Sequence, residues 1–389
     1  MEQNVKRIVE LFELYHLAKP TSVVSCGGRF EVLGNHTDHN HGLCIAAACN
    51  LQIIAAIKPI KEKVVRMKSE GIVIDEVDIT DSHPYENEHA TSAGLIRGVA
   101  TYLKEHGYKV GGFEAYSEST VFKGAGVSSS AAFELLIAYI FNKLYNDEKI
   151  PTIVLCKAGQ YAENIYFGKK SGLLDQIGVA YGGLVSIDFK NIEEPVIKKL
   201  EFPFKDLHFV IINTGGDHSS LSNLYSSIPE DMFKVANEMK QRFLAESTQE
   251  DLEYIKHTLS DLEYSRALHF YTENQRVQKA LLALEDKDEE LFLDMINKSR
   301  ESSTNNLKNM MVGEEYKGSP LEACDLFMKA TGGKGAVKIN GGGFAGSIIG
   351  VVPTECLEKV LKSMSRKYGE ENVKEIKIRE VGPTTLYNF

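Results

Sequence analysis

The chain has 389 residues, of which 43% are hydrophobic and 25% charged, and its formal net charge is −10 at pH 7. This length exceeds the size at which a single hydrophobic core stops growing, so two domains with a cleft between them are expected. The negative net charge argues against binding to nucleic acid, because the phosphates of the nucleic acid would repel the chain.

Cysteine usage and apolar stretches bear on the location of the protein. Six cysteines are scattered without a C-x-x-C pair, in a chain too large to need disulfide staples, which favours reduced thiols. The start, "MEQNVKRIVELFELYH", carries charges throughout and lacks the apolar core of a signal peptide. The run "LCIAAACNLQIIAAI" is interrupted by Asn50 and Gln52 and is too short to cross a bilayer. We expect a cytoplasmic, monomeric protein without a membrane partner.

The first 120 residues combine helical and strand-like periodicity. Apolar residues recur at helical spacing before Pro20, and a Ser/Thr start with a Gly stop brackets another helix near residue 100. Two alternating runs that meet at Glu70-Gly71 suit a hairpin with one solvated face. The expected elements are helices over 5–17 and 91–107, strands over 21–34, 43–60 and 111–119, and a hairpin over 63–80.

The rest of the chain begins with a glycine-rich loop that enters a long apolar helix, over residues 121–145. Further helices are expected over 152–168 and between 230 and 300. The polar stretch "KNIEEPVIKK" predicts a boundary between an N-terminal domain, residues 1–190, and a C-terminal domain, residues 191–389, whose last strands can pack back on the first. Strands and helices mix without regular βαβ alternation, which favours an α+β fold.

The segment "KGAGVSSSAAFELL" joins a glycine loop to the start of a helix. Glycines let the backbone approach a ligand, and the first amides of a helix are unpaired, so such a terminus can bind phosphate. The Walker A pattern is absent. A glycine loop followed by a serine N-cap is the structural alternative, and the segment alone favours neither.

The segment "GRFEVLGNHTDHNHG", residues 28 to 42, is unusually rich in histidine and asparagine. His36, His39, His41 and Asp38 offer the nitrogen and oxygen atoms that bind metals. The same residue types also form turns, and taken alone this segment favours the turn over a metal site.

Two further segments have a structural and a functional interpretation. Asp175 in "SGLLDQIGVAYGG" follows a small turn, where it either caps a helix or serves as a general base beside a substrate hydroxyl. The glycine loop "INGGGFAGS" lies between strand-like runs and by itself favours a purely structural role.

In this order, the segments resemble the GHMP kinase superfamily and, within it, the galactokinases. The first family signature, close to G-R-x-N-L-I-G-E-H-T-D-Y-N-x-G, matches "GRFEVLGNHTDHNHG" with unbroken spacing. The second, P-x-G-x-G-L-S-S-S-A, matches "FKGAGVSSSA" without the proline, and the third, near M-T-G-G-G-F-G-G-C, matches "INGGGFAGS". The family's A-E-H helix and G-I-M-D-Q turn match "AEN" and "GLLDQ". The resemblance spans nearly the whole chain and implies a two-domain GHMP-kinase-like fold with its active site in the interdomain cleft.

The resemblance implies an ATP-dependent kinase that phosphorylates the C1 hydroxyl of galactose. Asp175 would take, or favour loss of, the hydroxyl proton, and Arg29 would stabilise charge during phosphoryl transfer. Ser130 and Glu163 would hold Mg²⁺, a hard cation that prefers oxygen ligands and neutralises phosphate charge. The implied sugar contacts are Asn35, His36, Asp38 and, in "HSSLSNLY", Tyr225. The implied ATP contacts are Gly124, Ala125, Gly126, Val127, Ser128, Ser129 and Ser130, with Gly342, Gly343 and Phe344 on the nucleotide side.

One departure from the family concerns carbon 6 of the sugar. Asn35 stands where galactokinases carry a glutamate that binds the 6-hydroxyl. A glutamate about 4 Å from a uronate carboxylate would cost about 4 kcal/mol at an effective dielectric near 20, whereas asparagine removes this repulsion and offers an NH₂ donor. Plant galacturonokinases also lack this glutamate and carry histidine at the position of His39. Galacturonate, or another sugar altered at carbon 6, is therefore the alternative to galactose, which the other sugar positions favour.

Two other functions are weighed against the kinase. Some galactokinase-like proteins are regulators that bind sugar and ATP without turnover, but these often lose catalytic residues, whereas Asp175, Arg29 and the glycine-serine loop are intact. An enzyme for mevalonate-type alcohols is disfavoured because the sugar signature is matched so fully.

Overall fold

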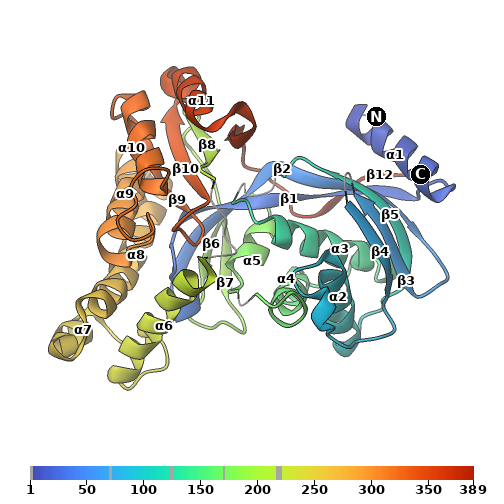
Figure 1. The fold of residues 1–389 in the computed structure, drawn as a ribbon, viewed down its shortest axis with the longest axis horizontal. Coiled ribbons are helices and arrows are strands. Elements are labelled where there is room, and N and C mark those ends of the chain that lie inside the picture. Colours follow the sequence, from blue (N-terminus) through green and yellow to red (C-terminus); the bar gives the residue numbers. More distant parts are fainter. Residues whose placement is uncertain (1–2, 70–71, 122–125, 170, 216–220) are drawn as a thin grey trace.

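The computed structural model describes residues 3–69, 72–121, 126–169, 171–215 and 221–389. Its larger sheet has eight strands in the order β12-β1-β2-β5-β3-β4, with β6 paired to β2 and β7 to β6 (Figure 1). All neighbours are antiparallel except β3 and β5. The strands are β1 (Ser22–Leu33), β2 (Leu43–Pro59), β3 (Val64–Ser69), β4 (Ile72–Asp78), β5 (Phe113–Ser119), β6 (Leu184–Asp188), β7 (Val196–Leu200) and β12 (Thr384–Asn388).

The smaller sheet is antiparallel, in the order β11-β8-β10-β9. Its strands are β8 (Leu207–Asn213), β9 (Ala336–Asn340), β10 (Ser347–Pro353) and β11 (Val373–Ile376). The long strands β1 and β2 run across the middle of the molecule between the two halves, and β1 contacts both β9 and β10 (Figure 1). The start of β1 thus pairs with the end of β2 within the larger sheet, and the part of β1 after Gly27 approaches the smaller sheet, where the Glu31 amide donates to Asn340 at 2.9 Å.

Helices cover both faces of the larger sheet. Helix α1 (Gln3–His16) buries Val5, Ile8 and Phe12 at helical spacing against Val23 and its neighbours. Val24, the next residue on β1, points to the opposite face, where the main core lies. That core is covered by α2 (Ser92–Glu105), α3 (Ser129–Tyr145), α4 (Thr152–Tyr161) and α5 (Leu174–Ala180).

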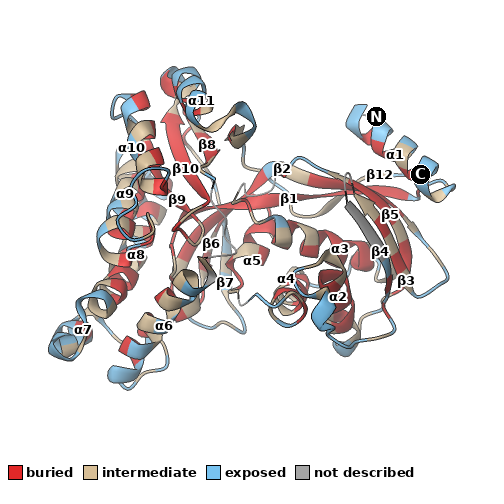
Figure 2. Cartoon of the chain, viewed as in Figure 1, coloured by how far each residue is buried: buried red, intermediate tan, exposed pale blue. Residues whose placement is uncertain are grey.

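The remaining helices surround the smaller sheet. Helices α8 (Asp261–Asp286) and α9 (Glu289–Ser302) contact β1, and α10 (Pro320–Thr331) and α11 (Thr354–Tyr368) pack on strands of the smaller sheet. Helices α6 (Ser222–Glu238) and α7 (Gln249–Ile255) pack against α8. Burial is concentrated on the central strands and on the inner faces of these helices (Figure 2).

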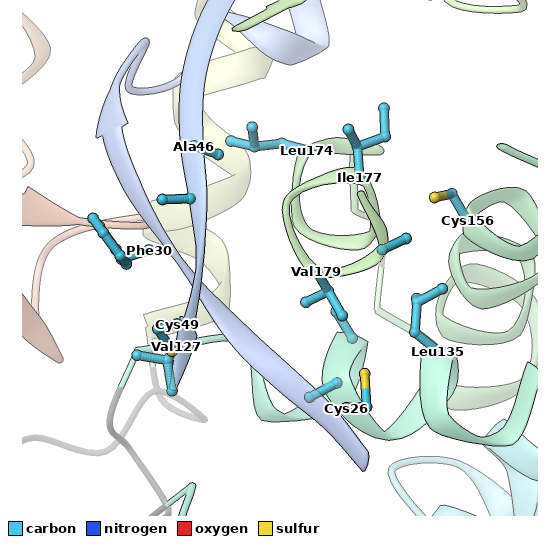
Figure 3. Packing of buried hydrophobic residues seen from close by; sticks show 14 of the residues in the cluster. Cys26, Phe30, Ala46, Cys49, Val127, Leu135, Cys156, Leu174, Ile177 and Val179 are labelled. Carbon is cyan, nitrogen blue, oxygen red and sulfur yellow. The ribbon is translucent and has the colours of Figure 1, made fainter. Parts of the chain in front are cut away.

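The short helix α5 is wedged into the main core. Leu174, Ile177 and Val179 lie between β1 and β2 on one side and α3 and α4 on the other (Figure 3). These apolar contacts fix the orientation of α5 and hold Asp175 in its first turn toward Arg29 on β1.

Most predicted elements are present with shifted ends, and the α+β class is confirmed. Mixed, mainly antiparallel sheets replace any βαβ alternation. The turn predicted at Glu70-Gly71 lies outside the described residues, although β3 and β4 on either side pair as predicted. The sequence did not predict the π-helix Ala162–Phe167 that continues α4. The chain enters the smaller sheet at β8, after β7 has paired with the larger one, and the boundary at residue 190 stays a prediction.

All six cysteines are buried and free. Among the described residues, no helix has the length and apolar character needed to cross a membrane.

Candidate active site

Arg29 and Asp175 form the centre of the candidate site. The Arg29 Nε and Nη2 atoms donate hydrogen bonds of 2.9 and 2.7 Å to Oδ1 of Asp175. Arg29 lies on β1, and Asp175 lies in the first turn of α5. Gly178, one turn later in α5, permits this approach, because a Cβ there would lie only 3.2 Å from the Cβ of Arg29. The fold thus joins two residues that are 146 positions apart.

Asp175 also accepts a hydrogen bond of 2.6 Å from the hydroxyl of Ser128 to its Oδ2 atom. Burial acts to raise the pKa of this carboxyl group, but the charges of Arg29 and Lys169 and the bonds from Ser128 and Arg29 outweigh it and lower the pKa. Asp175 is therefore held as a carboxylate with fixed orientation.

The glycine-serine loop is attached to this pair. The carbonyl oxygen of Gly126 accepts bonds of 2.8 Å from Arg29 Nη1 and from Asn340 Nδ2, and that of Val127 accepts 3.0 Å from the Arg29 amide. Gly126 has φ +69°, and a Cβ there would collide with Ser347. Gly124 and Ala125, predicted to contact phosphate, lie outside the described residues.

The N-terminus of α3 has the features of an anion site. Ser128, at the N-cap position, has φ 54°, and its side chain makes no capping bond because it turns to Asp175 instead. The first amides of a helix have no partner within the helix, and no side chain caps this one. Ser129 is exposed at this end. The terminus, with its partial positive charge, therefore points a set of donors toward the Asp175 side of the molecule.

Glu163 and Ser130 lie together beside this helix start. The Ser130 hydroxyl donates to Glu163 Oε1 at 3.0 Å, and Lys169 Nζ lies 2.8 Å from the same atom. The Ser171 hydroxyl donates to Oε2 at 2.6 Å. One buried carboxylate and one hydroxyl fit Mg²⁺, which takes few protein ligands and completes its shell with phosphate and water. The ammonium group of Lys169 balances the negative charge of Glu163, which a divalent cation would also balance.

The histidine-rich turn sends its side chains to different partners. His36 donates through Nε2 to the Gly342 carbonyl at 2.9 Å, and His39 accepts through Nδ1 from Asn40 at 2.9 Å. His41 stacks on Phe243 with ring centroids 3.7 Å apart. Within the described part of the chain, no three His, Cys, Asp or Glu side chains gather as a metal site.

Among the titratable groups of the histidine-rich turn, Asp38 has the pKa that matters most for the chemistry of the site. Its carboxylate lies against the backbone of Gly172, three residues before Asp175. Burial, followed by the charges of Asp175 and Glu31, raises its pKa to about 6. A hydroxyl-rich ligand that donates to this carboxylate would stabilise its charged form.

Asn35 is 1% exposed and is embedded in a polar network. Its Nδ2 atom donates to Glu31 Oε1 at 3.0 Å and to the Gly341 carbonyl at 2.7 Å. Its Oδ1 atom accepts from Asn309 Nδ2 at 3.0 Å. The predicted contact of Asn35 with carbon 6 stays a prediction, but its side chain is not a free donor.

Tyr225 lies against the third glycine loop, "INGGGFAGS", at Gly342, the residue whose carbonyl group bonds to His36. Tyr225 lies on α6 and packs edge-on against Phe344, with centroids 5.7 Å apart. Gly342 lies against this ring, since a Cβ there would lie 2.6 Å from a Tyr225 ring atom. Gly343 has φ +88° and lies against Asn309. Burial raises the pKa of Tyr225 to about 12, so its hydroxyl is neutral.

Two residues of α8 hold the histidine-rich turn and were missed in the sequence. Glu273 Oε1 accepts from the backbone amides of Gly34, at 3.0 Å, and Asn35, at 3.3 Å. His269 donates through Nε2 to the Asn35 carbonyl at 3.0 Å. Their spacing of four residues on a helix was the available signal, since it places both on one face.

The structure thus gathers the predicted residues into one region where the two sheets meet. Arg29, Asp175 and Ser128 are bonded to one another, and Ser130 and Glu163 lie beside them. His36 and Tyr225 reach the same glycine, Gly342, which lies one residue from Gly341 at the Arg29 guanidinium. The roles assigned to these residues stay predictions.

Comparisons with known proteins bear on this arrangement. The profile of the GHMP kinases N terminal domain matches residues 94–183, and the galactokinase galactose-binding signature matches residues 10–59. A galactokinase of Lactobacillus helveticus is 29% identical over 374 residues, 94% of each chain.

Solved structures share the fold. The crystal structure of Lactococcus lactis galactokinase complexed with galactose matches with a TM-score of 0.85 at 22% identity, over 99% of this chain and 100% of that one. The mevalonate kinase of Methanococcus jannaschii matches with a TM-score of 0.64 at 14% identity, over 92% and 98% of the two chains.

Residues 94–183 thus match a domain of the GHMP kinases, and the sugar-binding signature and the L. helveticus relative are those of galactokinases. These matches confirm the resemblance drawn from the motifs.

Proposed function

We propose that this protein is an ATP-dependent sugar kinase that phosphorylates the C1 hydroxyl of galactose. The observation that carries the proposal is the bonded set of Arg29, Asp175 and Ser128 beside the uncapped start of α3. This set places a carboxylate next to a group of phosphate-binding donors. The galactokinase signature over residues 10–59 supports galactose as the sugar.

In the proposed reaction, the C1 oxygen of galactose attacks the γ-phosphorus of ATP. The bond between that oxygen and phosphorus forms, the bond from phosphorus to the bridging oxygen of ADP breaks, and the hydroxyl proton is lost. In this scheme Asp175 accepts this proton or favours its departure. Because its pKa is lowered, the carboxylate is charged before sugar binds.

Arg29 has two roles in this scheme. It holds the Asp175 carboxylate through Oδ1 and leaves Oδ2 to Ser128, so the sugar hydroxyl meets a carboxylate of fixed orientation. Its charge also lies next to the phosphate-binding loop, since Nη1 donates to Gly126. A fixed positive charge there stabilises negative charge that develops during transfer.

Ser130 and Glu163 would hold Mg²⁺ together with the ATP phosphates. When bound, the ion supplies positive charge that balances the phosphate oxygens. Within the chain, Glu163 is kept in place by Ser130, Ser171 and Lys169.

The sugar would be held by His36, Asp38 and Tyr225, with Asn35 at the wall behind them. Asp38 offers hydroxyl-binding oxygens, and the neutral Tyr225 offers both a donor and an acceptor. The six buried, free cysteines fit the reducing cytoplasm that we propose as its location.

The test is ADP formation with a panel of sugars, each with MgATP. We expect turnover with galactose in the wild-type protein. Asp175→Asn keeps the shape and removes the charge, so turnover should fall by about 100-fold or more. Since that change leaves Arg29 without its anion, the melting temperature must be measured alongside. Near wild-type turnover in a folded Asp175→Asn variant would contradict the role of Asp175, and binding of sugar and ATP without turnover in wild type would favour a sensor.

A further inference from the structure

A buried pair of side chains, Glu134 and Gln176, adjoins the proposed magnesium ligand Glu163. All three residues are 0% exposed. Gln176 Nε2 donates hydrogen bonds of 2.9 Å to Oε2 of Glu134 and of 3.2 Å to Oε2 of Glu163. Glu134 lies on α3, Gln176 on α5 and Glu163 in the π-helix that continues α4. One amide group therefore joins three helical segments of the candidate site.

The packing of α4 leaves room for this pair. Gly159 lies on α4, and a Cβ there would lie 3.1 Å from Oε2 of Glu134 and 3.2 Å from Cγ of Gln176. Cys156, one turn earlier, donates through Sγ to the carbonyl oxygen of Gln176 at 3.5 Å. Cys156 and Leu135, the neighbour of Glu134, belong to the same core (Figure 3). Close packing of α3, α4 and α5 thus fixes the two side chains.

The two carboxylate oxygens of Glu163 have different partners. Oε1 accepts from the Ser130 hydroxyl and lies 2.8 Å from Lys169 Nζ. Oε2 accepts from the Ser171 hydroxyl and from Gln176. Since Ser130 is the other proposed ligand of Mg²⁺, Oε1 is the oxygen that would bind the ion. Of these four donors, Gln176 alone is fully buried, so it is the one that a ligand arriving from solvent would leave in place.

Glu134 holds Gln176 without adding a second buried charge. Burial, followed by the charge of Glu163, raises the pKa of Glu134 well above its usual range. Oε1 of Glu134 and Oε1 of Gln176 are buried and have no hydrogen-bond partner within the described part of the chain. A proton on Glu134 turns one of these acceptors into a donor. An amide at position 134 would offer the same combination of one acceptor and a donor.

We propose that Glu134 and Gln176 are positioning residues: Glu134 holds the amide of Gln176, and Gln176 holds Glu163 in the orientation that binds Mg²⁺. The inference rests on the proposed sugar kinase function. Both side chains are buried, so both act through Glu163. Partners of this kind orient metal ligands, and their loss typically costs about 10-fold to 100-fold in metal affinity.

The experiment measures the Mg²⁺ concentration for half-maximal rate and KM for galactose in wild type, Glu134→Met and Glu134→Gln. Methionine keeps the length of the side chain but removes the strong acceptor, so the Mg²⁺ requirement should rise by about tenfold, with KM for galactose within about twofold. Glutamine keeps an acceptor for Gln176, so it should retain the wild-type requirement within about twofold. Asn142→Leu is the matched control, because Asn142 is a buried polar residue of α3 that bonds to Ile150 instead.

Two further measurements separate positioning from a general loss of structure. The thermal shift given by Mg²⁺ with a non-hydrolysable ATP analogue should shrink in Glu134→Met, but not in Glu134→Gln or Asn142→Leu. In a Glu163→Gln background, Glu134→Met should have no further effect on the Mg²⁺ requirement, because it acts through Glu163. Gln176→Met should raise the requirement as Glu134→Met does, and it decides the question if Glu134→Met does not fold.

Each outcome has a defined meaning. An unchanged Mg²⁺ requirement in folded Glu134→Met or Gln176→Met would overturn the inference while leaving the kinase function intact. An effect of Glu134→Gln or Asn142→Leu as large as that of Glu134→Met would also overturn it, since a charge or a loosened helix would then explain the result. No turnover of any sugar by the wild-type protein would instead refute the proposed function itself.

Discussion

The hydroxyl of Ser128 donates a hydrogen bond of 2.6 Å to Oδ2 of Asp175, so a residue of the loop proposed to bind phosphate is bonded to the carboxylate proposed for catalysis. Ser128 holds the left-handed backbone conformation that begins α3. Under the proposed function, a shift of this loop on binding of ATP would therefore alter the hydrogen bond to Asp175. This hydrogen bond therefore connects the proposed nucleotide-binding loop with the residue proposed to act on the sugar hydroxyl.

Removal of this contact should change the pH dependence of the reaction. Ser128→Ala deletes a bond that lowers the pKa of Asp175, so that pKa should rise. Since Asp175 works as a carboxylate, activity should then be lost at a higher pH on acidification than in wild type. The stability above the unfolded-state pKa should also fall, by about 1.5–3 kcal/mol for a bond to a charged group. Profiles of kcat/KM against pH test this, and an unmoved acid limb would contradict it.

Asp38 should give the enzyme a second acid-sensitive group. Burial and the charges of Asp175 and Glu31 raise its pKa to about 6 in the free protein. Sugar hydroxyls that donate to the carboxylate need its charged form, so KM for sugar should rise as the pH falls below about 6.

The effect of Asp38 on stability has the opposite sign. Because the native state favours the protonated form, its contribution is fully present below the unfolded-state pKa of 3.8 and is lost as the pH rises through about 6. Asp38→Asn should weaken sugar binding above about pH 6, where the wild-type carboxylate is charged, and should remove both dependences. A KM for galactose that is constant through this range in wild type would show that Asp38 does not bind the sugar in its charged form.

Glu163 should set the requirement for Mg²⁺. Glu163→Gln removes the buried charge beside Ser130, so the Mg²⁺ concentration for half-maximal rate should rise by about tenfold or more. The thermal shift given by Mg²⁺ with a non-hydrolysable ATP analogue supplies a readout independent of turnover and should shrink in parallel. Glu322→Gln, on the far helix α10, is a matched control for loss of one carboxylate. Equal Mg²⁺ dependence in both variants would argue against the site.

Glu273 should matter for stability and sugar affinity together. Burial acts to raise its pKa, but Arg276, His269 and Lys338 outweigh it and lower the pKa to about 2. Its stabilising contribution is thus present above the unfolded-state pKa of 4.5 and lost as the pH falls through about 2. Glu273→Gln leaves Arg276 unpaired and should cost about 3–5 kcal/mol in the free energy of unfolding. Denaturant titration measures this, and a loss below about 1 kcal/mol would mean that the turn is held by other contacts.

The sequence predicted the members of the site better than their contacts. Arg29 and Asp175 were identified from motifs with fixed spacing, and the structure brings them together because Gly178 lets α5 approach β1. Gly126 was assigned to phosphate approach, but its positive φ and its contact with Ser347 show a packing requirement as well. Gly126→Val would therefore disturb the loop even without a phosphate.

Contacts between distant segments were not predictable from the sequence. Asn35 was expected to offer a donor to the sugar, but its donors are taken by Glu31 and by Gly341, which lies 306 residues away. Glu273 and His269 lie in a long, largely polar helix, where their spacing resembles that of any solvated face. Only the packing of α8 against β1 gives these residues a role.

The central claim is that this chain transfers the γ-phosphate of ATP to the C1 hydroxyl of galactose. The direct measurement is ³¹P NMR of the products formed by the purified protein with galactose and MgATP. The account predicts one sugar phosphate, galactose 1-phosphate, formed in equal amount with ADP. Phosphate on any other carbon, or no galactose-dependent ADP from folded protein, would contradict it.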